Sequence, residues 1–129
     1  MSGRVLFPEV GLYVISRNPE GLFLVQKTSS LIQFPFFTLR GGESWESLLS
    51  QIKKEWRIEN ASHRLLGVSA RRNPLDPGRA YCVFQLEAWP KTVPPDFFWE
   101  DFTKTLSFDD VTTRIYEHFM DSFSSIWVD

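Results

Sequence analysis

Residues 37–58 read FTLRGGESWESLLSQIKKEWRI, and this segment is the most informative about the fold. It opens with a short apolar segment that ends at Gly41 and Gly42, a pattern typical of an extended segment closing in a tight turn. After Ser44, large apolar side chains recur at three- and four-residue steps, namely Trp45, Leu48, Leu49, Ile52 and Trp56. This single apolar stripe predicts a helix over residues 44–56, with Ser44 as its N-cap.

Outward from this helix, the sequence predicts strands separated by turns. Runs of β-branched and aromatic residues predict strands at 10–16, 22–26, 65–70 and 81–89, with a short extended segment at 36–39. The connection between the first two strands carries asparagine, proline and glycine, which favour a turn. We therefore expect these two strands to form a hairpin.

The remaining segments complete a mixed α/β layer protein. Residues 28–34 are expected to form a loop. A second helix is expected to begin at Ser107 and to bury an apolar face that consists of Val111, Ile115 and Phe119.

Length and composition limit the chain to a few classes of protein. Its 129 residues have room for one domain, taken as residues 1–129, and 43% hydrophobic with 23% charged residues excludes a disordered chain. The net charge of -2 offers no global attraction for polyanions. Cys82 is the single cysteine, which excludes a disulfide framework and a cysteine-cluster metal site and predicts a reducing, intracellular compartment. No apolar run is long enough to span a membrane.

The entry to the predicted helix, from Phe37 to Ser44, resembles the Nudix hydrolase box. The family often reads W-x-L-P-G-G here, and this chain reads F-T-L-R-G-G. The box itself is G-x5-E-x7-R-E-U-x-E-E-x-G-U, where U is bulky and apolar. The match continues over residues 50–58 if the loop after Gly42 is shortened and one residue is omitted before Ser50. The resemblance covers residues 8–123 and implies an α/β/α sandwich with a mixed β-sheet.

This chain departs from the family at the residues that bind Mg²⁺. By position, the three glutamates of the box become Gln51, Lys54 and Glu55, so their summed charge falls from -3 to 0. Glu43 stands for the earlier glutamate of the box, and Arg57 stands at its last glycine. We expect Lys54 to occupy the place of the cation, and a hard divalent ion needs several anionic oxygens around it. The departures predict no bound metal, no cofactor and no catalytic residue.

The box region is then expected to be a vestigial cleft, whose candidate ligand-binding residues are Arg40, Glu43, Gln51, Lys54 and Glu55. The predicted function is a non-catalytic Nudix-fold binding module or a subunit of a larger protein or ribonucleoprotein assembly, with a protein as partner. Two alternatives stay open. One is a divergent Nudix hydrolase that acts on a nucleoside diphosphate derivative through a rebuilt metal site. The other is a pseudoenzyme that binds RNA or a nucleotide through the cations of the cleft.

Aromatic residues are unusually frequent for so small a core, at 16% of the chain with 12 phenylalanines. Several lie in segments expected to be loops, and the end of the chain is apolar. The candidate partner-binding residues are Phe98, Trp99, Ile126 and Trp127, the last two in a possible docking tail at 124–129. The alternative is that these side chains close the protein's own core.

Overall fold

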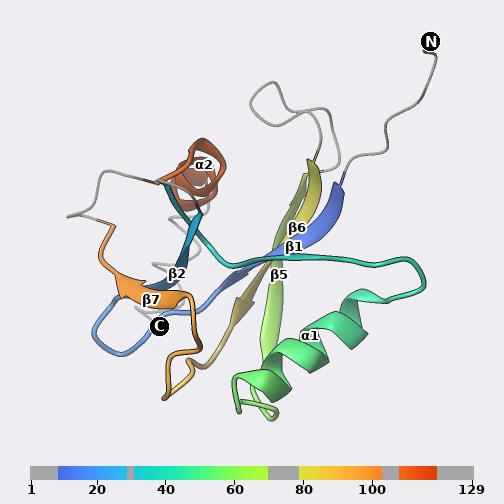
Figure 1. The fold of residues 1–129 in the computed structure, drawn as a ribbon, viewed down its shortest axis with the longest axis horizontal. Helices are drawn as coiled ribbons and strands as arrows, with labels where there is room; N and C mark the ends of the chain where they lie inside the picture. The colour runs from blue at the N-terminus through green and yellow to red at the C-terminus, as the bar shows by residue number, and fades with distance from the viewer. Residues whose placement is uncertain (1–8, 29–30, 70–78, 103–107, 119–129) are drawn as a thin grey trace.

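The computed structural model of the chain describes residues 9–28, 31–69, 79–102 and 108–118 (Figure 1). The strands and helices in these ranges are, in chain order, β1 (Glu9–Ile15), β2 (Phe23–Thr28), β3 (Leu31–Gln33), β4 (Phe36–Thr38), α1 (Trp45–Glu55), β5 (His63–Ser69), β6 (Arg79–Leu86), β7 (Phe97–Glu100) and α2 (Asp110–His118).

The strands form two sheets. The first has the order β4-β1-β6-β5 and is mixed, because β1 and β6 run parallel while its other pairs are antiparallel. The second has the order β3-β2-β7 and is antiparallel throughout. The central strands of the mixed sheet therefore come from opposite halves of the chain.

β1 and β2 do not form the predicted hairpin. The connection between them turns back as expected, since Oδ1 of Asn18 accepts hydrogen bonds from the backbone N–H of Glu20 at 3.0 Å and of Leu22 at 2.9 Å. A β-bridge between Arg17 and Phe23 closes this turn, and beyond it the two strands join different sheets. They part because both edges of β1 are already paired, one with β4 and the other with β6.

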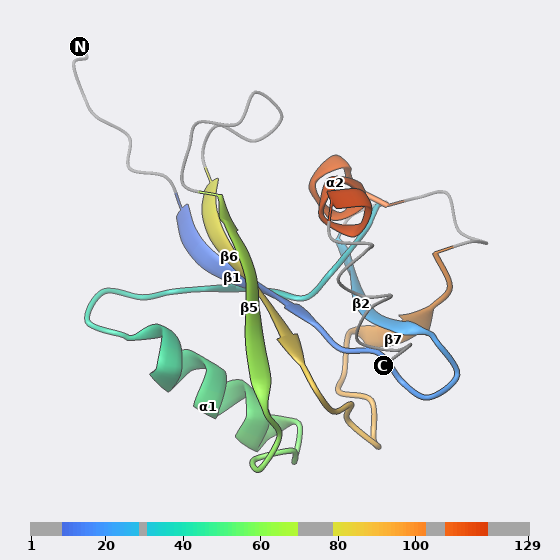
Figure 2. The same cartoon turned by 180° about the vertical axis from the view of Figure 1, so that it is seen from behind.

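The mixed sheet has one helix on each face (Figure 2). Successive side chains of a strand point to opposite faces. Accordingly, Leu12 and Val14 of β1 pack in a buried cluster with the apolar stripe of α1. Tyr13 and Ile15 pack in a second cluster with the apolar face of α2. The predicted α/β/α sandwich with a mixed sheet is confirmed.

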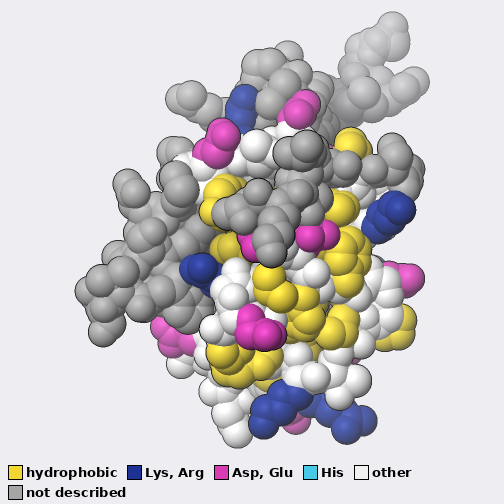
Figure 3. Space-filling view, turned by 90° about the vertical axis from the view of Figure 1, so that its left-hand side faces the viewer, with side chains coloured by type: hydrophobic (Ala, Val, Ile, Leu, Met, Phe, Trp, Pro, Cys, Tyr) yellow, Lys and Arg dark blue, Asp and Glu magenta, His cyan; other side chains and the backbone are white. Residues whose placement is uncertain are grey.

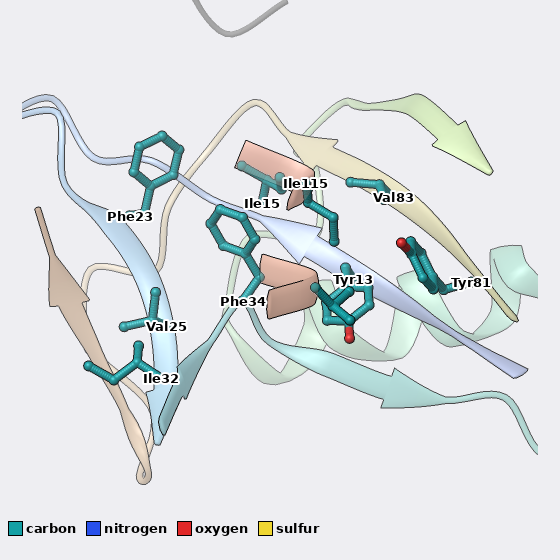
Figure 4. Close-up of a cluster of buried hydrophobic side chains, with 10 residues drawn as sticks. Tyr13, Ile15, Phe23, Val25, Ile32, Phe34, Tyr81, Val83 and Ile115 are labelled. Carbon is teal, nitrogen blue, oxygen red and sulfur yellow. The ribbon is translucent and has the colours of Figure 1, made fainter. Parts of the chain in front are cut away.

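Aromatic side chains fill much of the second cluster (Figure 4). Phe34 is fully buried, with its ring centroid 5.8 Å from that of Phe23 and 5.2 Å from that of Phe102.

Two expectations from the sequence are corrected by the second sheet. The segment 28–34, expected as a loop, contains β3, and the aromatic segment 97–100 is β7 rather than a loop. Both strands pair with β2, whose backbone groups they satisfy on its two edges.

α1 forms where the sequence predicts it. It spans Trp45–Glu55, and its N-cap is Ser44, whose hydroxyl accepts a hydrogen bond from the backbone N–H of Ser47 at 3.0 Å. Leu48, Leu49 and Ile52 are buried against the sheet, as the apolar stripe requires.

α2 begins later than expected, at Asp110. Its N-cap is Asp109, whose carboxylate accepts a hydrogen bond from the backbone N–H of Thr112 at 2.7 Å. Ser107, the predicted start, and Phe119 lie outside the described residues. Val111 and Ile115 are buried as predicted. Neither helix of the described ranges is long and apolar enough to cross a membrane.

Candidate functional site

A cleft of about 390 Å³ opens between β4, the turn at Gly41 and Gly42, and α1; we call it the glycine-turn cleft. Its apolar lining consists of Phe36, Phe37, Leu48 and Ile52. Its polar lining consists of Thr38, Arg40, Glu43, Gln51 and Glu55. Four of the five residues predicted for the vestigial site therefore meet here.

Lys54 is the exception, because it does not line this cleft. It is exposed on α1, whereas the cleft is lined from the helix by positions 48, 51, 52 and 55. Residues three apart on a helix are neighbours, which is why the sequence groups Lys54 with Gln51. Lys54 is thus not among the residues that line the cleft, where the sequence led us to expect it. The helix presents the neutral Gln51 and one carboxylate, Glu55, to the cleft.

Glu43 closes the glycine turn with both its backbone and its side chain. Its backbone N–H donates to the carbonyl oxygen of Arg40 at 3.0 Å, and its Oε1 accepts from the backbone N–H of Arg40 at 3.0 Å. Gly42 has a φ of 82°, a conformation that favours glycine. One of the two carboxylates of the cleft is thus engaged in holding the turn.

The donor set of the cleft does not fit a magnesium site of the Nudix kind. Such a site surrounds a hard divalent ion with several carboxylate oxygens. Here Glu43 is engaged in the turn, Gln51 is neutral, and the lining includes the guanidinium of Arg40, so Glu55 is the one carboxylate of the lining not tied into the turn. Within the described ranges, no group of three or more His, Cys, Asp or Glu side chains is placed to hold a metal ion. No reaction step through a metal follows from these residues.

α1 ends in a hydrogen-bonded cap centred on Arg57. The backbone N–H of Arg57 donates to the carbonyl oxygen of Lys54 at 3.1 Å, and that of Ile58 donates to Lys53 at 2.8 Å, which is the Schellman pattern. The cap holds Arg57 at a φ of 60°. This left-handed conformation costs a non-glycine residue roughly 1–2 kcal/mol. In the resemblance to the Nudix box Arg57 stands at the last glycine, and its positive φ is a conformation that glycine adopts more readily.

A second pocket, of about 530 Å³, opens beside this cap, and we call it the helix-end pocket. Its charged lining consists of Glu55, Arg57 and Lys91, and Thr92 is also polar. Its apolar lining consists of Trp56, Ile58, Val93, Pro94 and Pro95. Because Glu55 lines both cavities, they adjoin. Lys and Arg side chains gather at the lower end of the molecule in Figure 3, the end at which α1 terminates in Figure 1.

Sequence reasoning missed the helix-end pocket. It is built from the end of α1 and the connection before β7, which lie more than thirty positions apart in the chain. The available signal was Arg57 at a position where the Nudix box has glycine.

Two of the four residues predicted to contact a partner, Phe98 and Trp99, pack inside the fold. Phe98 and Trp99 lie in β7 and are partly buried, Phe98 against the cluster on the α2 side and Trp99 against the cluster on the α1 side. Ile126 and Trp127 lie outside the described residues. Much of the aromatic content of β7 is therefore used for packing.

Two titratable groups outside these cavities have shifted pKa values. Burial lowers the pKa of His63, and the charge of Lys53 lowers it further, while Glu46 opposes the shift. Lys53 Nζ lies 2.7 Å from Nδ1 of His63, and since an ammonium group can only donate, Nδ1 accepts. Burial raises the pKa of the Cys82 thiol, as is typical of a buried and unreactive cysteine.

The mixed sheet between two helices, with a glycine turn leading from β4 into α1, defines a Nudix-like fold. No protein-family model matches the sequence, and a comparison with the curated proteins gives no significant match. Solved structures do match, and they carry the assignment of the fold.

Three of these structures show the range of the likeness. The C-terminal domain of mouse MUTYH, in complex with human PCNA, is 18% identical with a TM-score of 0.64, and the match covers 90% of each chain. A putative Nudix hydrolase family member from Chromobacterium violaceum is 18% identical with a TM-score of 0.56, over 88% of this chain and 77% of that one. A MutT protein from Methanosarcina mazei Go1 is 13% identical with a TM-score of 0.56, over 93% and 98%.

Proposed function

We propose that this chain is a non-catalytic Nudix-fold binding module, acting as a subunit of a larger protein or ribonucleoprotein assembly. One observation carries the proposal: the lining of the glycine-turn cleft is poor in free carboxylates, which a Nudix metal site would need. Of its charged lining, Glu43 is tied to Arg40 by two hydrogen bonds, which leaves Glu55 beside a neutral Gln51. A cleft of this kind supports binding better than metal-assisted hydrolysis.

A protein partner is favoured over RNA. The domain of MUTYH with this fold was solved in a complex with another protein, PCNA, which supports a role of this kind for the fold. The cleft itself carries one arginine against two glutamates, and the chain is acidic overall, with a net charge of -2. Neither property favours a polyanionic backbone.

The C-terminal segment 124–129 belongs to the proposal as a docking tail. Its Ile126 and Trp127 are large apolar residues, and large apolar residues, tryptophan above all, are frequent anchors of interfaces. Trp127→Ala should leave the melting temperature of the chain nearly unchanged and weaken recovery of its protein partner. A fall of many degrees with unchanged recovery would assign Trp127 to the core.

Binding of Mn²⁺, followed by water-proton relaxation, tests the lost ligand set without relying on a substrate. The wild-type chain and Glu55→Gln should bind Mn²⁺ equally weakly. The variant Gln51→Glu should bind it more tightly than the wild-type chain, because it adds a carboxylate to the cleft beside Glu55. Tight binding by the wild-type chain that Glu55→Gln abolishes would favour the alternative, a divergent hydrolase with a rebuilt metal site.

A further inference from the structure

The geometry at the end of α1 points to the helix-end pocket as the site where a partner protein is gripped. We propose that it takes an extended peptide segment in which an acidic residue stands next to an aliphatic one. The inference rests on the proposed function, because it names the partner chemistry of a binding module. It concerns a different cavity from the glycine-turn cleft, although Glu55 lines both.

Backbone strain is concentrated at this pocket. Within the described ranges, two residues other than glycine have a positive φ, Arg57 at 60° and Asp96 at 72°. Arg57 lines the pocket, and Asp96 directly follows Pro95, which also lines it. Residues held in such conformations cluster at binding sites, where the surrounding structure maintains them. A glycine at position 57 would satisfy the cap without strain, so the chain carries the arginine side chain beside this pocket at a cost in backbone energy.

The charges of the pocket select an acidic group. Arg57 and Lys91 are both exposed and line the cavity together, and they outnumber the one carboxylate of the lining, Glu55. Charge-assisted hydrogen bonds from a guanidinium and an ammonium group are strong when the acceptor is a carboxylate. Glu55 in turn offers an acceptor for a backbone N–H of an extended segment. The arrangement suits a carboxylate that is followed by peptide backbone.

The apolar lining selects an aliphatic neighbour rather than a nucleobase. It includes Ile58, Val93, Pro94 and Pro95, which offer no aromatic face. Trp56 also lines the pocket, but it is 4% exposed and packs in the core. A nucleobase that binds at a protein surface commonly stacks on an exposed aromatic ring. An aliphatic side chain packs against a concave apolar surface and does not require an aromatic ring.

The test is an NMR titration of the full ¹⁵N-labelled chain with three probes. These are the blocked peptide acetyl-Leu-Asp-Leu-Asp-Leu-amide, its counterpart with asparagine at both aspartates, and adenosine monophosphate. The aspartate peptide should shift the amide signals of residues 55–58 and 91–95. The asparagine peptide and the nucleotide should bind about tenfold more weakly or not at all. The asparagine peptide lacks the carboxylates, and the nucleotide lacks the aliphatic side chains.

Arg57→Gly separates a binding role from a structural one. The variant should lower the affinity for the aspartate peptide about tenfold, because it removes the cation. It should raise the melting temperature by a few degrees, because it removes the backbone strain. Lys27→Gln, which removes an exposed cation from β2, should leave peptide affinity unchanged.

Unchanged peptide affinity in Arg57→Gly, or equal binding of the two peptides, would overturn the inference, as would preferred binding of the nucleotide. Failure of the peptide alone leaves the proposed non-catalytic function standing. Metal-dependent hydrolysis by the chain would overturn that function whatever the peptide does.

Discussion

Arg40 and Glu43 hold the glycine turn closed through two reciprocal hydrogen bonds, each 3.0 Å long. The side chain that stands for a glutamate of the Nudix box is therefore part of the scaffold that leads from β4 into α1. A residue that has become structural is expected to respond to mutation through stability, and its charge is expected to matter less than its hydrogen-bonding oxygen.

The first prediction follows from this pair. Glu43→Ala should lower the free energy of unfolding by about 1 kcal/mol, because the backbone N–H of Arg40 loses its acceptor. Glu43→Gln should cost less than half of that, since an amide oxygen still accepts. Urea unfolding of the three proteins measures both effects. Equal losses in the two variants would show that the carboxylate charge, rather than the hydrogen bond, stabilises the turn.

The second prediction concerns the aromatic core. Phe34→Ala should lower the free energy of unfolding by about 3–5 kcal/mol, because Phe34 is fully buried among aromatic rings and its removal leaves a cavity. Val68→Ala is the control: Val68 is 61% exposed on β5, and its loss should cost less than about 1 kcal/mol. A small effect at Phe34 would mean that the segment after β3 is not part of the core.

The elements that local sequence determines could be predicted, and those set by distant pairing could not. α1 and its cap at Ser44 follow from apolar spacing and one hydroxyl, both within a few residues of each other. β3 and β7 have three and four residues, so each segment fits a loop or a strand equally well until β2 supplies a partner on each side. The separation of β1 from β2 depends on β6, far along the chain, and no local pattern contains it.

The third prediction is a pH dependence of stability that arises at His63. Its pKa in the folded chain lies below the ordinary value of 6.5, through burial and the nearby charge of Lys53. The unfolded chain therefore takes up a proton more readily than the folded one. The contribution of His63 to the free energy of unfolding is fully present above about pH 6.5 and is lost as the pH falls below that value. Urea midpoints between pH 7.5 and 5.5, together with an NMR titration of the imidazole, measure it.

Two variants serve as controls for the histidine. His63→Gln should flatten the fall in stability over this range. Lys53→Met should raise the pKa of His63 toward the ordinary value, because it removes a neighbouring positive charge. If stability falls equally with and without His63, other groups account for the pH dependence and the assignment is wrong.

The candidate site, like the fold, has one part that the sequence predicts and another that it does not. Arg40, Glu43, Gln51 and Glu55 could be placed together, because the glycine turn and the helical period bring them to one cleft. Lys54 shows the limit of that reasoning: a helical position gives the approximate face, but the direction of a long side chain depends on its surroundings. The sequence could not show that Arg57 and Lys91 line the same pocket, because the connection that carries Lys91 reaches the helix end only in the folded chain.

An activity screen decides whether the chain hydrolyses nucleoside diphosphate compounds. The purified chain should be assayed with Mg²⁺ and with Mn²⁺ against nucleotide sugars, dinucleoside polyphosphates, capped RNA and oxidised nucleotides. We expect no turnover above the protein-free background for any of them, and no difference between the wild-type chain and Glu55→Gln. Metal-dependent turnover by the wild-type chain that Glu55→Gln abolishes would contradict a non-catalytic role.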